Sequence, residues 1–334
     1  MRFAIIGTNK ITHAFIEAAN QDTRFELYAV YSRQMETAQA FGQPYGAKCY
    51  FDNLEELAQC NEVDAVYIAS PNSFHAEQAC LLLAKGKHVL CEKPIAANSN
   101  QTEKMIATAK ANKVCLMEAM MITHLPNYQQ IKQQSARIGK VTKYHASFCQ
   151  YSSRYDLYKA GEKPNTFNLA FANGSLVDIG IYPLYPVIDL FGLPSEINSQ
   201  AHKLASGVDG CGDVILSYQN DQHSLQAVIT HSKISNGANV CEIQGEKGRI
   251  FWQHPSLFHE VFIELNGQAV ETLTLEQTEN RMTYELSHFI DLVEQGLIES
   301  PVNSWKLSLQ VQSVMDTVRQ QQGIIYPADA VLEV

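Results

Sequence analysis

The chain has 334 residues, 46% of them hydrophobic and 18% charged, a length and composition typical of about two globular domains. Its 25 basic and 35 acidic side chains give a formal net charge of −10, which argues against a nucleic-acid or anionic-membrane partner. No stretch approaches the roughly 20 apolar residues of a membrane span. The first apolar run, residues 3–6, is too short for a secretory signal.

Eight cysteines are scattered through the chain, with no C-x-x-C pair and no Cys/His pair at zinc-ligand spacing. We therefore expect no metal site. Several cysteines lie inside apolar runs, where a free thiol behaves as a small hydrophobic side chain. Because disulfides are rare in reducing compartments, we expect reduced thiols in a cytoplasmic protein.

The first third of the chain alternates short apolar runs with helical patterns. The runs that predict strands are residues 3–6, 25–31, 63–69, 88–90 and 113–116. This alternation predicts an α/β fold with a doubly wound parallel sheet that is covered on both faces. The polar segments that follow these strands are 7–12, 32–33, 70–75 and 91–94. Ligands bind at the carboxyl ends of such strands, so we expect these segments to converge on one edge of the sheet.

The first of these segments departs from the dinucleotide fingerprint G-x-G-x-x-G. It reads GTNKIT at 7–12 and retains only the first glycine. Asparagine tolerates a positive φ best among the other residues, so we expect Asn9 to hold the tight turn and Thr12 to loosen the contact of helix and strand. An ordinary strand-to-helix turn is the alternative. The candidate cofactor residues here are Gly7, Thr8, Asn9, Lys10 and Ile11.

The second segment bears on the choice of cofactor. An NAD site usually has Asp or Glu at the end of the second strand, whereas this strand ends in Ser32 and Arg33. A hydroxyl followed by a guanidinium suits a 2′-phosphate, so NADP is preferred over NAD. A solvated arginine that caps the strand is the alternative.

Three segments resemble the Gfo/Idh/MocA family of NAD(P)-dependent oxidoreductases: DAVYIASPNSFH at 64–75, GKHVLCEKP at 86–94 and GSLVDIGIYP at 174–183. The GEKG turn at 245–248 and the tail at 289–327 also fit, so the resemblance covers nearly the whole chain. It implies an N-terminal Rossmann domain and a larger α/β domain, whose open, mostly antiparallel sheet carries the substrate pocket and an oligomer face. It also implies a cis peptide in the E-K-P segment.

The resemblance also implies roles for individual residues. Lys93 takes the position of a lysine near the nicotinamide and the reacting carbon, and Glu92 that of the residue facing the nicotinamide ribose. Asp178 and Tyr182 take the positions of the acid and of the His or Tyr in the second-domain motif. The residues that match the cofactor-side loop are Ser70, Pro71, Asn72 and His75, the last of which is equally well explained as a structural histidine at a helix start.

The residues themselves are consistent with proton transfer. A tyrosine is a weak base with a pKa near 10, and a nearby ammonium such as that of Lys93 would favour its phenolate. Asp178 precedes Tyr182 by four residues, on the same face if this segment is helical, although Pro183 and Pro186 mean that the helix begins here or kinks. Asp178 would then accept hydrogen bonds from substrate hydroxyls or orient Lys93. The alternatives are a loop lysine in water, an N-cap acid and a half-buried aromatic.

From residue 141 the pattern changes to period-two alternation, which predicts strands with one buried face, and two helical stretches follow at 279–294 and 305–319. We expect a dinucleotide-binding domain at 1–121 and a domain for substrate binding and oligomerisation at 122–334. A sheet face without covering helices favours a homodimer or homotetramer. Further candidates for substrate binding are His124, Arg154 and Asn168.

These patterns predict an NAD(P)-dependent dehydrogenase or reductase that acts on a CH–OH group of a sugar, cyclitol or trans-dihydrodiol. A tyrosine in place of histidine resembles the branch with dihydrodiol dehydrogenases and glucose-fructose or aldose oxidoreductases. Thr123 stands where many relatives place an arginine, and this leaves the substrate open. A non-catalytic protein that senses a nucleotide or a sugar on the same fold is the alternative, supported by the altered glycines.

Overall fold

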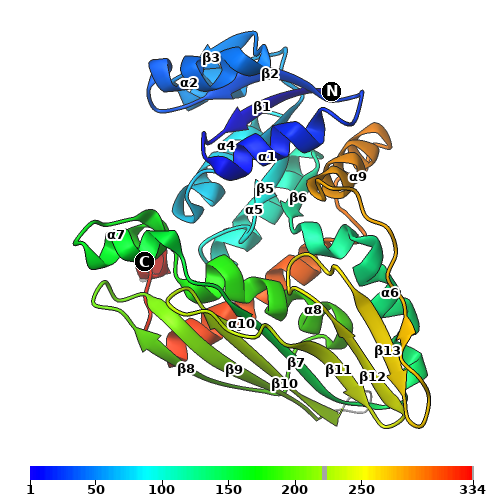
Figure 1. Cartoon of the computed structure of the whole chain (residues 1–334). Coiled ribbons are helices and arrows are strands. Elements are labelled where there is room, and N and C mark those ends of the chain that lie inside the picture. The colour runs from blue at the N-terminus through cyan, green and yellow to red at the C-terminus, as the bar shows by residue number, and fades with distance from the viewer. Residues whose placement is uncertain (220–223, 333–334) are drawn as a thin grey trace. The chain divides into compact units, whose positions relative to one another are not determined.

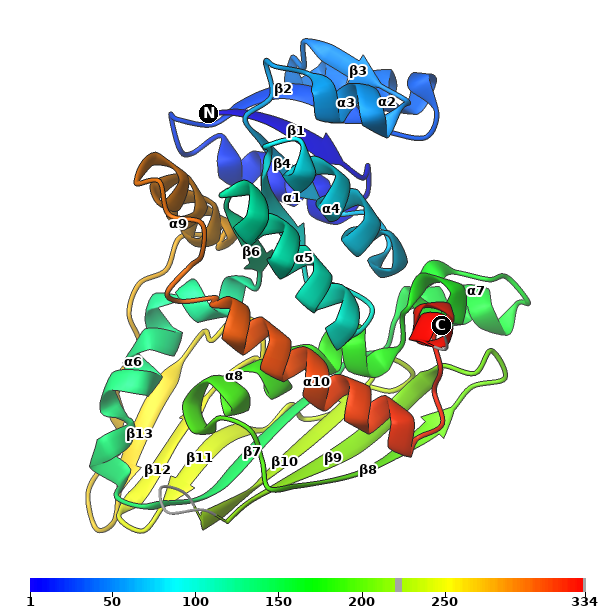
Figure 2. The ribbon, with the colours of Figure 1, turned by 180° about the vertical axis from the view of Figure 1, so that it is seen from behind.

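The computed structural model describes residues 1–219 and 224–332, and its chain divides into two compact units. Unit 1 comprises Met1–Met121 and Thr278–Leu309, and unit 2 comprises Ile122–Gln277 and Gln310–Val334 (Figures 1 and 2). The expected division at 121/122 falls at the same residue as the first break. The expectation of one continuous segment from 122 to 334 was wrong, because residues 278–309 return to unit 1.

Unit 1 contains a parallel six-stranded sheet in the order β3-β2-β1-β4-β5-β6. Its strands are β1 (Arg2–Ile6), β2 (Glu26–Tyr31), β3 (Cys49–Phe51), β4 (Ala65–Ile68), β5 (His88–Glu92) and β6 (Leu116–Ala119). The order reverses between β1 and β4, and this is the switch point at which doubly wound sheets bind ligands. The predicted α/β class is confirmed.

Helices cover both faces of this sheet. They are α1 (Lys10–Ala19), α2 (Met35–Gly42), α3 (Leu54–Gln59), α4 (His75–Ala84), α5 (Ser99–Asn112) and α9 (Met282–Glu294). Apolar side chains of α1 and α9 form one core with Phe3 and Tyr67, and α4 and α5 pack with Ile6 and Val66 on the other face. The chain returns to unit 1 because α9 carries an apolar stripe, including Leu286, into the first of these cores.

Two details of unit 1 differ from the predicted elements. The last strand begins at Leu116, not at residue 113, because Lys113 has a φ of +56° and caps the C-terminus of α5. The strand Cys49–Phe51 has three partly buried residues and was not predicted, since its sequence is too short to show a period.

Unit 2 is built on an eight-stranded sheet in the order β14-β13-β12-β11-β7-β10-β9-β8. Its strands are β7 (Val141–Cys149), β8 (Glu196–Lys203), β9 (Asp209–Gln219), β10 (Ser224–Ser232), β11 (Cys241–Gly245), β12 (Gly248–Trp252), β13 (Val261–Leu265) and β14 (Glu271–Thr272). All neighbours are antiparallel except β7 and β10, which are parallel. The expected open, mostly antiparallel sheet is therefore confirmed.

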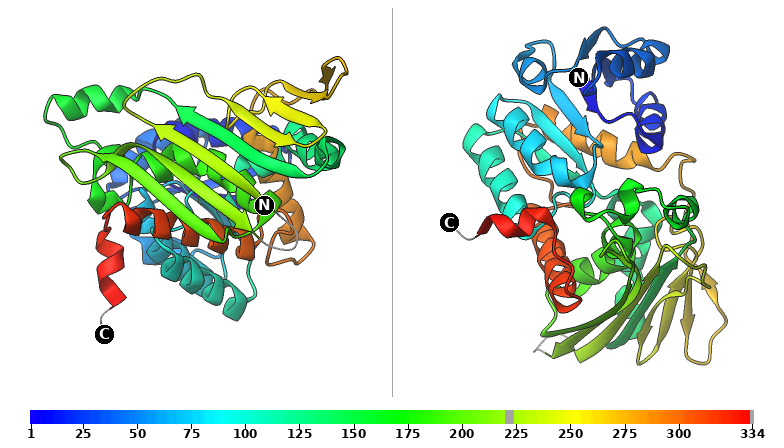
Figure 3. Two further views of the ribbon diagram at one scale, coloured as in Figure 1. Left: turned by 90° about the horizontal axis from the view of Figure 1, so that it is seen from below. Right: turned by 90° about the vertical axis from the view of Figure 1, so that its left-hand side faces the viewer.

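One face of this sheet packs against helices and the other does not. The row Leu216, Ala227, Tyr144, Ile243, Ile250 and Ile263 crosses the sheet in register and is fully or almost fully buried. Helix α8 (Ile181–Phe191) lies on this face, where the Tyr144 hydroxyl donates a hydrogen bond to Pro183 O at 2.8 Å. Seen from below, no helix of the described residues crosses the opposite face (Figure 3).

The remaining helices include α6 (Pro126–Gln134), α7 (Ser153–Lys159) and α10 (Trp305–Gln321), the last of which begins in unit 1 and ends in unit 2. By length and composition, one helical stretch, Leu169–Phe191, would suffice to cross a membrane. However, 72% of its most apolar window is buried, as in the core helix of a soluble protein. The eight cysteines are free thiols.

Candidate functional site

The turn after β1 lies against the turn after β4 in unit 1. Gly7 has a φ of +107°, and a Cβ on it would lie 2.5 Å from Ala69 O, closer than any side chain can approach. This is why the first fingerprint glycine is retained. Thr8 is half-buried, whereas Lys10 and Ile11 are exposed at the start of α1, where backbone N–H groups favour an anion.

Asn9 does not hold a positive φ, so that expectation was wrong. Its φ is −100°, and its side chain caps α1 by accepting hydrogen bonds from the N–H groups of Ile11 at 3.1 Å and Thr12 at 3.4 Å. Its Nδ2 also donates to Ala69 O at 3.0 Å. Asn9 therefore ties the start of α1 to the end of β4. Thr12 is fully buried behind this cap.

The end of β2 carries the predicted selector of the cofactor. Ser32 is half-buried, with its N–H donating to Phe51 O at 3.1 Å, and Arg33 is exposed. An exposed guanidinium beside a hydroxyl, at the carboxyl end of a strand in this sheet, suits a phosphate ester.

His75 joins two of the predicted cofactor segments. Its Nδ1 lies 3.0 Å from Pro94 O and its Nε2 lies 2.8 Å from Ser70 O, and the ring is fully buried. Burial lowers the pKa of His75, although both carbonyls oppose that shift. The ring therefore holds the loop after β4 against the cis Lys93–Pro94 peptide, so the structure supports the structural alternative for this histidine.

Elsewhere in the loop after β4, Ser70 Oγ donates to Gln78 Oε1 at 2.7 Å. Pro71 precedes a short 3₁₀ turn that begins at Asn72, and both residues are half-buried. These polar groups follow β4 directly, at the edge where the sheet order reverses.

Glu92 ends β5 and points into the core of unit 1, where it accepts a hydrogen bond from the Tyr67 hydroxyl at 2.5 Å. Burial raises the pKa of Glu92, while the neighbouring Lys93 ammonium opposes the shift. Glu285 on α9 is fully buried nearby, and the charge of Glu92 contributes to raising its pKa. Sequence reasoning missed Tyr67 and Glu285, because neither lies in a polar strand-end segment.

In unit 2 the segment with the second-domain motif is helical, which was the condition for Asp178 and Tyr182 to share a face. A π-helical turn (Leu176–Gly180) leads directly into α8, and Pro183 lies in the first turn of α8. π-turns are rare and often occur at functional sites. Asp178 and Tyr182 are both half-buried, and the Tyr182 ring contacts Phe148 with centroids 5.8 Å apart.

Buried polar groups support this helix start from the sheet. Asp209 on β9 accepts a hydrogen bond from the N–H of Leu176 at 2.6 Å, and Ser175 Oγ lies 3.0 Å from His231 Nδ1. Burial raises the pKa of Asp209 to about 7 and lowers that of His231 to about 4. Gly180 allows the helix to approach His231, since a Cβ would lie 3.0 Å from its ring.

Lys233, which follows β10, was missed by sequence reasoning. Its Nζ forms an ion pair with Asp178 Oδ2. Nothing in the alternating pattern of that strand distinguished this lysine from a surface residue. The structure therefore adds a cation to the second-domain motif.

The three further substrate candidates lie in separate segments of unit 2. His124 is half-buried in a 3₁₀ turn (Met121–His124), and Arg154 is exposed in the first turn of α7. Asn168 caps another short turn, accepting a hydrogen bond from the N–H of Ala170 at 3.0 Å. Their roles in substrate binding stay predictions.

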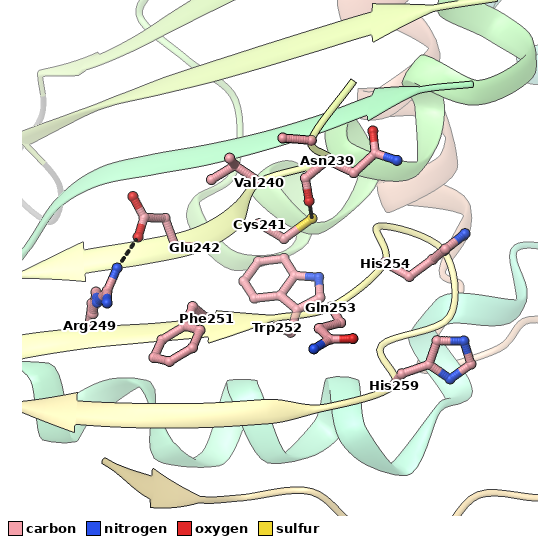
Figure 4. Close-up of a pocket in the computed structure, with 11 residues that line it drawn as sticks. Asn239, Val240, Cys241, Glu242, Arg249, Phe251, Trp252, Gln253, His254 and His259 are labelled. Carbon is pink, nitrogen blue, oxygen red and sulfur yellow. Dashed lines mark hydrogen bonds and ion pairs between the residues drawn. The ribbon is translucent and has the colours of Figure 1, made fainter. Parts of the chain in front are cut away.

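A cavity of about 550 Å³ lies elsewhere, along β11 and β12 of unit 2 (Figure 4). It is lined by residues that include Glu242, Arg249, Phe251, His254 and His259, and none of the sequence-predicted site residues lines it. Among residues 1–219 and 224–332, no group of three His, Cys, Asp or Glu side chains could hold a metal ion.

Comparison with known proteins agrees with both units. Residues 1–120 match the family model described as "Oxidoreductase family, NAD-binding Rossmann fold", and residues 128–251 match the "GFO/IDH/MocA C-terminal domain". The chain is 46% identical to scyllo-inositol 2-dehydrogenase (NADP(+)) IolU of Bacillus subtilis, over 98% of this chain and 99% of that protein. It is 29% identical to trans-1,2-dihydrobenzene-1,2-diol dehydrogenase of Xenopus tropicalis, over 98% and 99%.

A solved structure shows the same fold. The 3-ketoreductase from Actinomadura kijaniata, in complex with TDP-benzene and NADP, superposes with a TM-score of 0.82 at 25% identity, over 96% of this chain and 98% of that one. The family models and the full-length relatives together cover both units of the chain. The chain therefore belongs to the Gfo/Idh/MocA family of oxidoreductases and is a nicotinamide-dependent enzyme that acts on CH–OH groups.

Proposed function

We propose that this enzyme transfers a hydride between NADP and a polyhydroxylated small molecule, namely a sugar, a cyclitol or a trans-dihydrodiol. The observation that carries the proposal is the 46% identity, over 98% of the chain, to a scyllo-inositol 2-dehydrogenase that uses NADP+. The names of the trans-1,2-dihydrobenzene-1,2-diol dehydrogenase and the 3-ketoreductase also describe oxidoreduction at a carbon that bears oxygen, which supports this substrate class.

The residues of unit 1 fit a bound dinucleotide. Gly7 allows the two strand-end turns to approach, the N-terminus of α1 favours an anionic pyrophosphate, and Arg33 offers a guanidinium to a 2′-phosphate. The nicotinamide, when bound, supplies the hydride acceptor or donor. We therefore assign the cofactor residues predicted from the sequence to NADP, with His75 acting through the loops it holds.

Lys93 and Tyr182 are the proposed proton-transfer pair. A tyrosine hydroxyl is too weak a base near neutral pH, so an ammonium that favours the phenolate is needed for it to accept the hydroxyl proton of the substrate. During oxidation the carbinol carbon loses a hydride and its hydroxyl loses a proton to Tyr182, which leaves a carbonyl. Asp178 would accept a hydrogen bond from a further hydroxyl.

Titration with NADPH and with NADH, followed by fluorescence, tests the cofactor assignment. We expect NADPH to bind more tightly, and Arg33→Ala to weaken NADPH binding about tenfold, because charge-assisted hydrogen bonds to the phosphate are lost. The affinity for NADH serves as the internal control and should not change. Tighter binding of NADH by the wild type would refute the preference for NADP.

Turnover of Lys93→Met tests the proton-transfer pair. We expect kcat to fall by about 10²- to 10⁴-fold, the usual contribution of general acid–base catalysis, while NADPH binding is retained. The control is Lys85→Met at the exposed C-cap of α4, which should behave as wild type. Full turnover by Lys93→Met would exclude this role.

Two broader assignments complete the proposal. The uncovered face of the unit 2 sheet would join copies of the chain into a homodimer or homotetramer.

The free cysteines are consistent with the cytoplasm as the compartment in which the enzyme works.

A further inference from the structure

Lys233 is a buried cation next to the acid of the second-domain motif. Its side chain is 11% exposed, that of Asp178 is 30% exposed, and the ammonium pairs with Asp178 Oδ2. Burying an unpaired ammonium is strongly unfavourable, so a lysine at this depth requires an anionic partner. Loss of Lys233 would in turn leave the partly buried Asp178 carboxylate without this cation.

The backbone fixes both residues. The N–H of Lys233 donates to Gly210 O at 2.9 Å, and the carbonyl of Lys233 accepts from the N–H of Ser152 at 2.9 Å. The N–H of Asp178 donates to Gly174 O at 3.2 Å within the helix start. The pair therefore joins the end of β10 to the π-turn through two anchored main-chain segments.

This arrangement sets the chemistry of Asp178. An adjacent ammonium favours the ionised carboxylate, which can only accept hydrogen bonds. With Oδ2 paired to Lys233, the ion pair restrains this end of the carboxylate. Such a group distinguishes a hydroxyl, which can donate a hydrogen bond, from an ether oxygen or a hydrogen atom at the same position.

We propose that Lys233 is a positioning residue that holds Asp178 as an oriented hydrogen-bond acceptor for one hydroxyl group of the polyol substrate. This inference deepens the proposed function and rests on it. Lys233 acts through Asp178 and takes no part in the proton transfer assigned to Lys93 and Tyr182.

Steady-state kinetics with scyllo-inositol and NADP+ test this role in Lys233→Met, Lys233→Gln and Lys233→Arg. We expect both neutral variants to raise KM about tenfold to a hundredfold with little change in kcat. Without Lys233 the Asp178 carboxylate loses its orientation, and its hydrogen bond to the substrate hydroxyl is weakened. Lys233→Arg should restore most of the affinity. A structural role alone would not separate KM from kcat in this way.

Lys132→Met is the matched control. Lys132 on α6 pairs with Asp189 in the last turns of α8, with Nζ 2.8 Å from Oδ2, so its loss breaks another Lys–Asp pair, at the end of α8 far from the π-turn. We expect its KM to equal that of the wild type. A wild-type KM in both neutral Lys233 variants, or an equal rise in KM in Lys132→Met, would overturn the proposal.

Crystal structures of the Lys233 variants give a second measurement that does not depend on turnover. Asp178 should keep its rotamer in Lys233→Arg and leave it in Lys233→Met or Lys233→Gln. If the wild type oxidises no polyol, the proposed function fails, and the structures still decide whether Lys233 positions Asp178. An unchanged Asp178 rotamer in the neutral variants would overturn the inference in either case.

Discussion

Glu285 is a buried acid whose two carboxylate oxygens have no hydrogen-bond partner within the described residues. Burial first, and then the charge of Glu92, raise the pKa of Glu285 well above its usual range. The folded protein therefore keeps a proton that the unfolded chain releases above a pKa of about 4.3. It follows that Glu285 lowers the free energy of unfolding increasingly as pH rises from 5 toward 8.

Replacing Glu285 by glutamine removes this ionisation while keeping the shape of the side chain. We expect Glu285→Gln to exceed the wild type in free energy of unfolding by roughly 1–3 kcal/mol at pH 8 and by less at pH 5, because each unit by which the folded pKa exceeds the unfolded pKa costs the wild type about 1.4 kcal/mol in this range. Denaturant titrations at both values measure this difference. The control is Glu103→Gln, an exposed acid on α5. If the two variants have equal stability at pH 8, the argument is wrong.

At the scale of an element, Asn9 both caps α1 and ties it to the end of β4. Asn9→Ala should lower the free energy of unfolding by about 1 kcal/mol, the typical value of an N-cap, and weaken NADPH binding, because the start of α1 loses its bond to Ala69. Thermal unfolding and fluorescence titration measure the two effects.

Asn53→Ala is the control for that variant. Asn53 caps α3 in the same unit by accepting hydrogen bonds from the N–H groups of Glu55 and Glu56. It should cost a similar amount of stability and leave NADPH binding unchanged. If both variants lose NADPH affinity equally, cap strength and not the bond to β4 governs cofactor binding.

The elements show how far sequence reasoning reaches. Strand and helix periods predicted the alternation of unit 1 and the strands of unit 2, because burial of one face imposes those periods. The conformation of Asn9 was not predictable, since capping and a positive φ both favour asparagine. Lys233 was missed for another reason: its contact with Asp178 joins residues that are far apart in the chain.

The return of residues 278–309 to unit 1 shows the same limit at a larger scale. The helical pattern at 279–294 was visible in the sequence, and the observed helix, Met282–Glu294, confirms it. Periodicity reports that a helix has an apolar stripe but not which core buries that stripe. Only the packing of Leu286 and Phe289 with Phe3 and Phe15 assigns α9 to the first unit.

At the scale of the whole molecule, the uncovered sheet face predicts self-association. One row of residues crosses neighbouring strands on this face, and its side chains are exposed or half-buried in the single chain. They share a face because residues directly opposite one another on paired strands point to the same side of the sheet. Ile215 in this row is 40% exposed, and Phe251 stacks on Phe262 with centroids 5.2 Å apart. The row comprises Ile215, Val228, His145, Glu242, Phe251 and Phe262. Apolar side chains gathered on one open face are typical of a protein interface.

Light scattering after size exclusion measures the resulting mass. The wild type should elute as a dimer or tetramer, and Ile215→Lys should shift the protein toward the monomer, because burying an unpaired ammonium in an isologous interface costs free energy twice. Leu193→Lys is the control, since Leu193 is 47% exposed in the turn after α8 and lies outside the sheet. A monomeric wild type at micromolar concentration, or equal dissociation of both variants, would show that copies of the chain do not meet through this face.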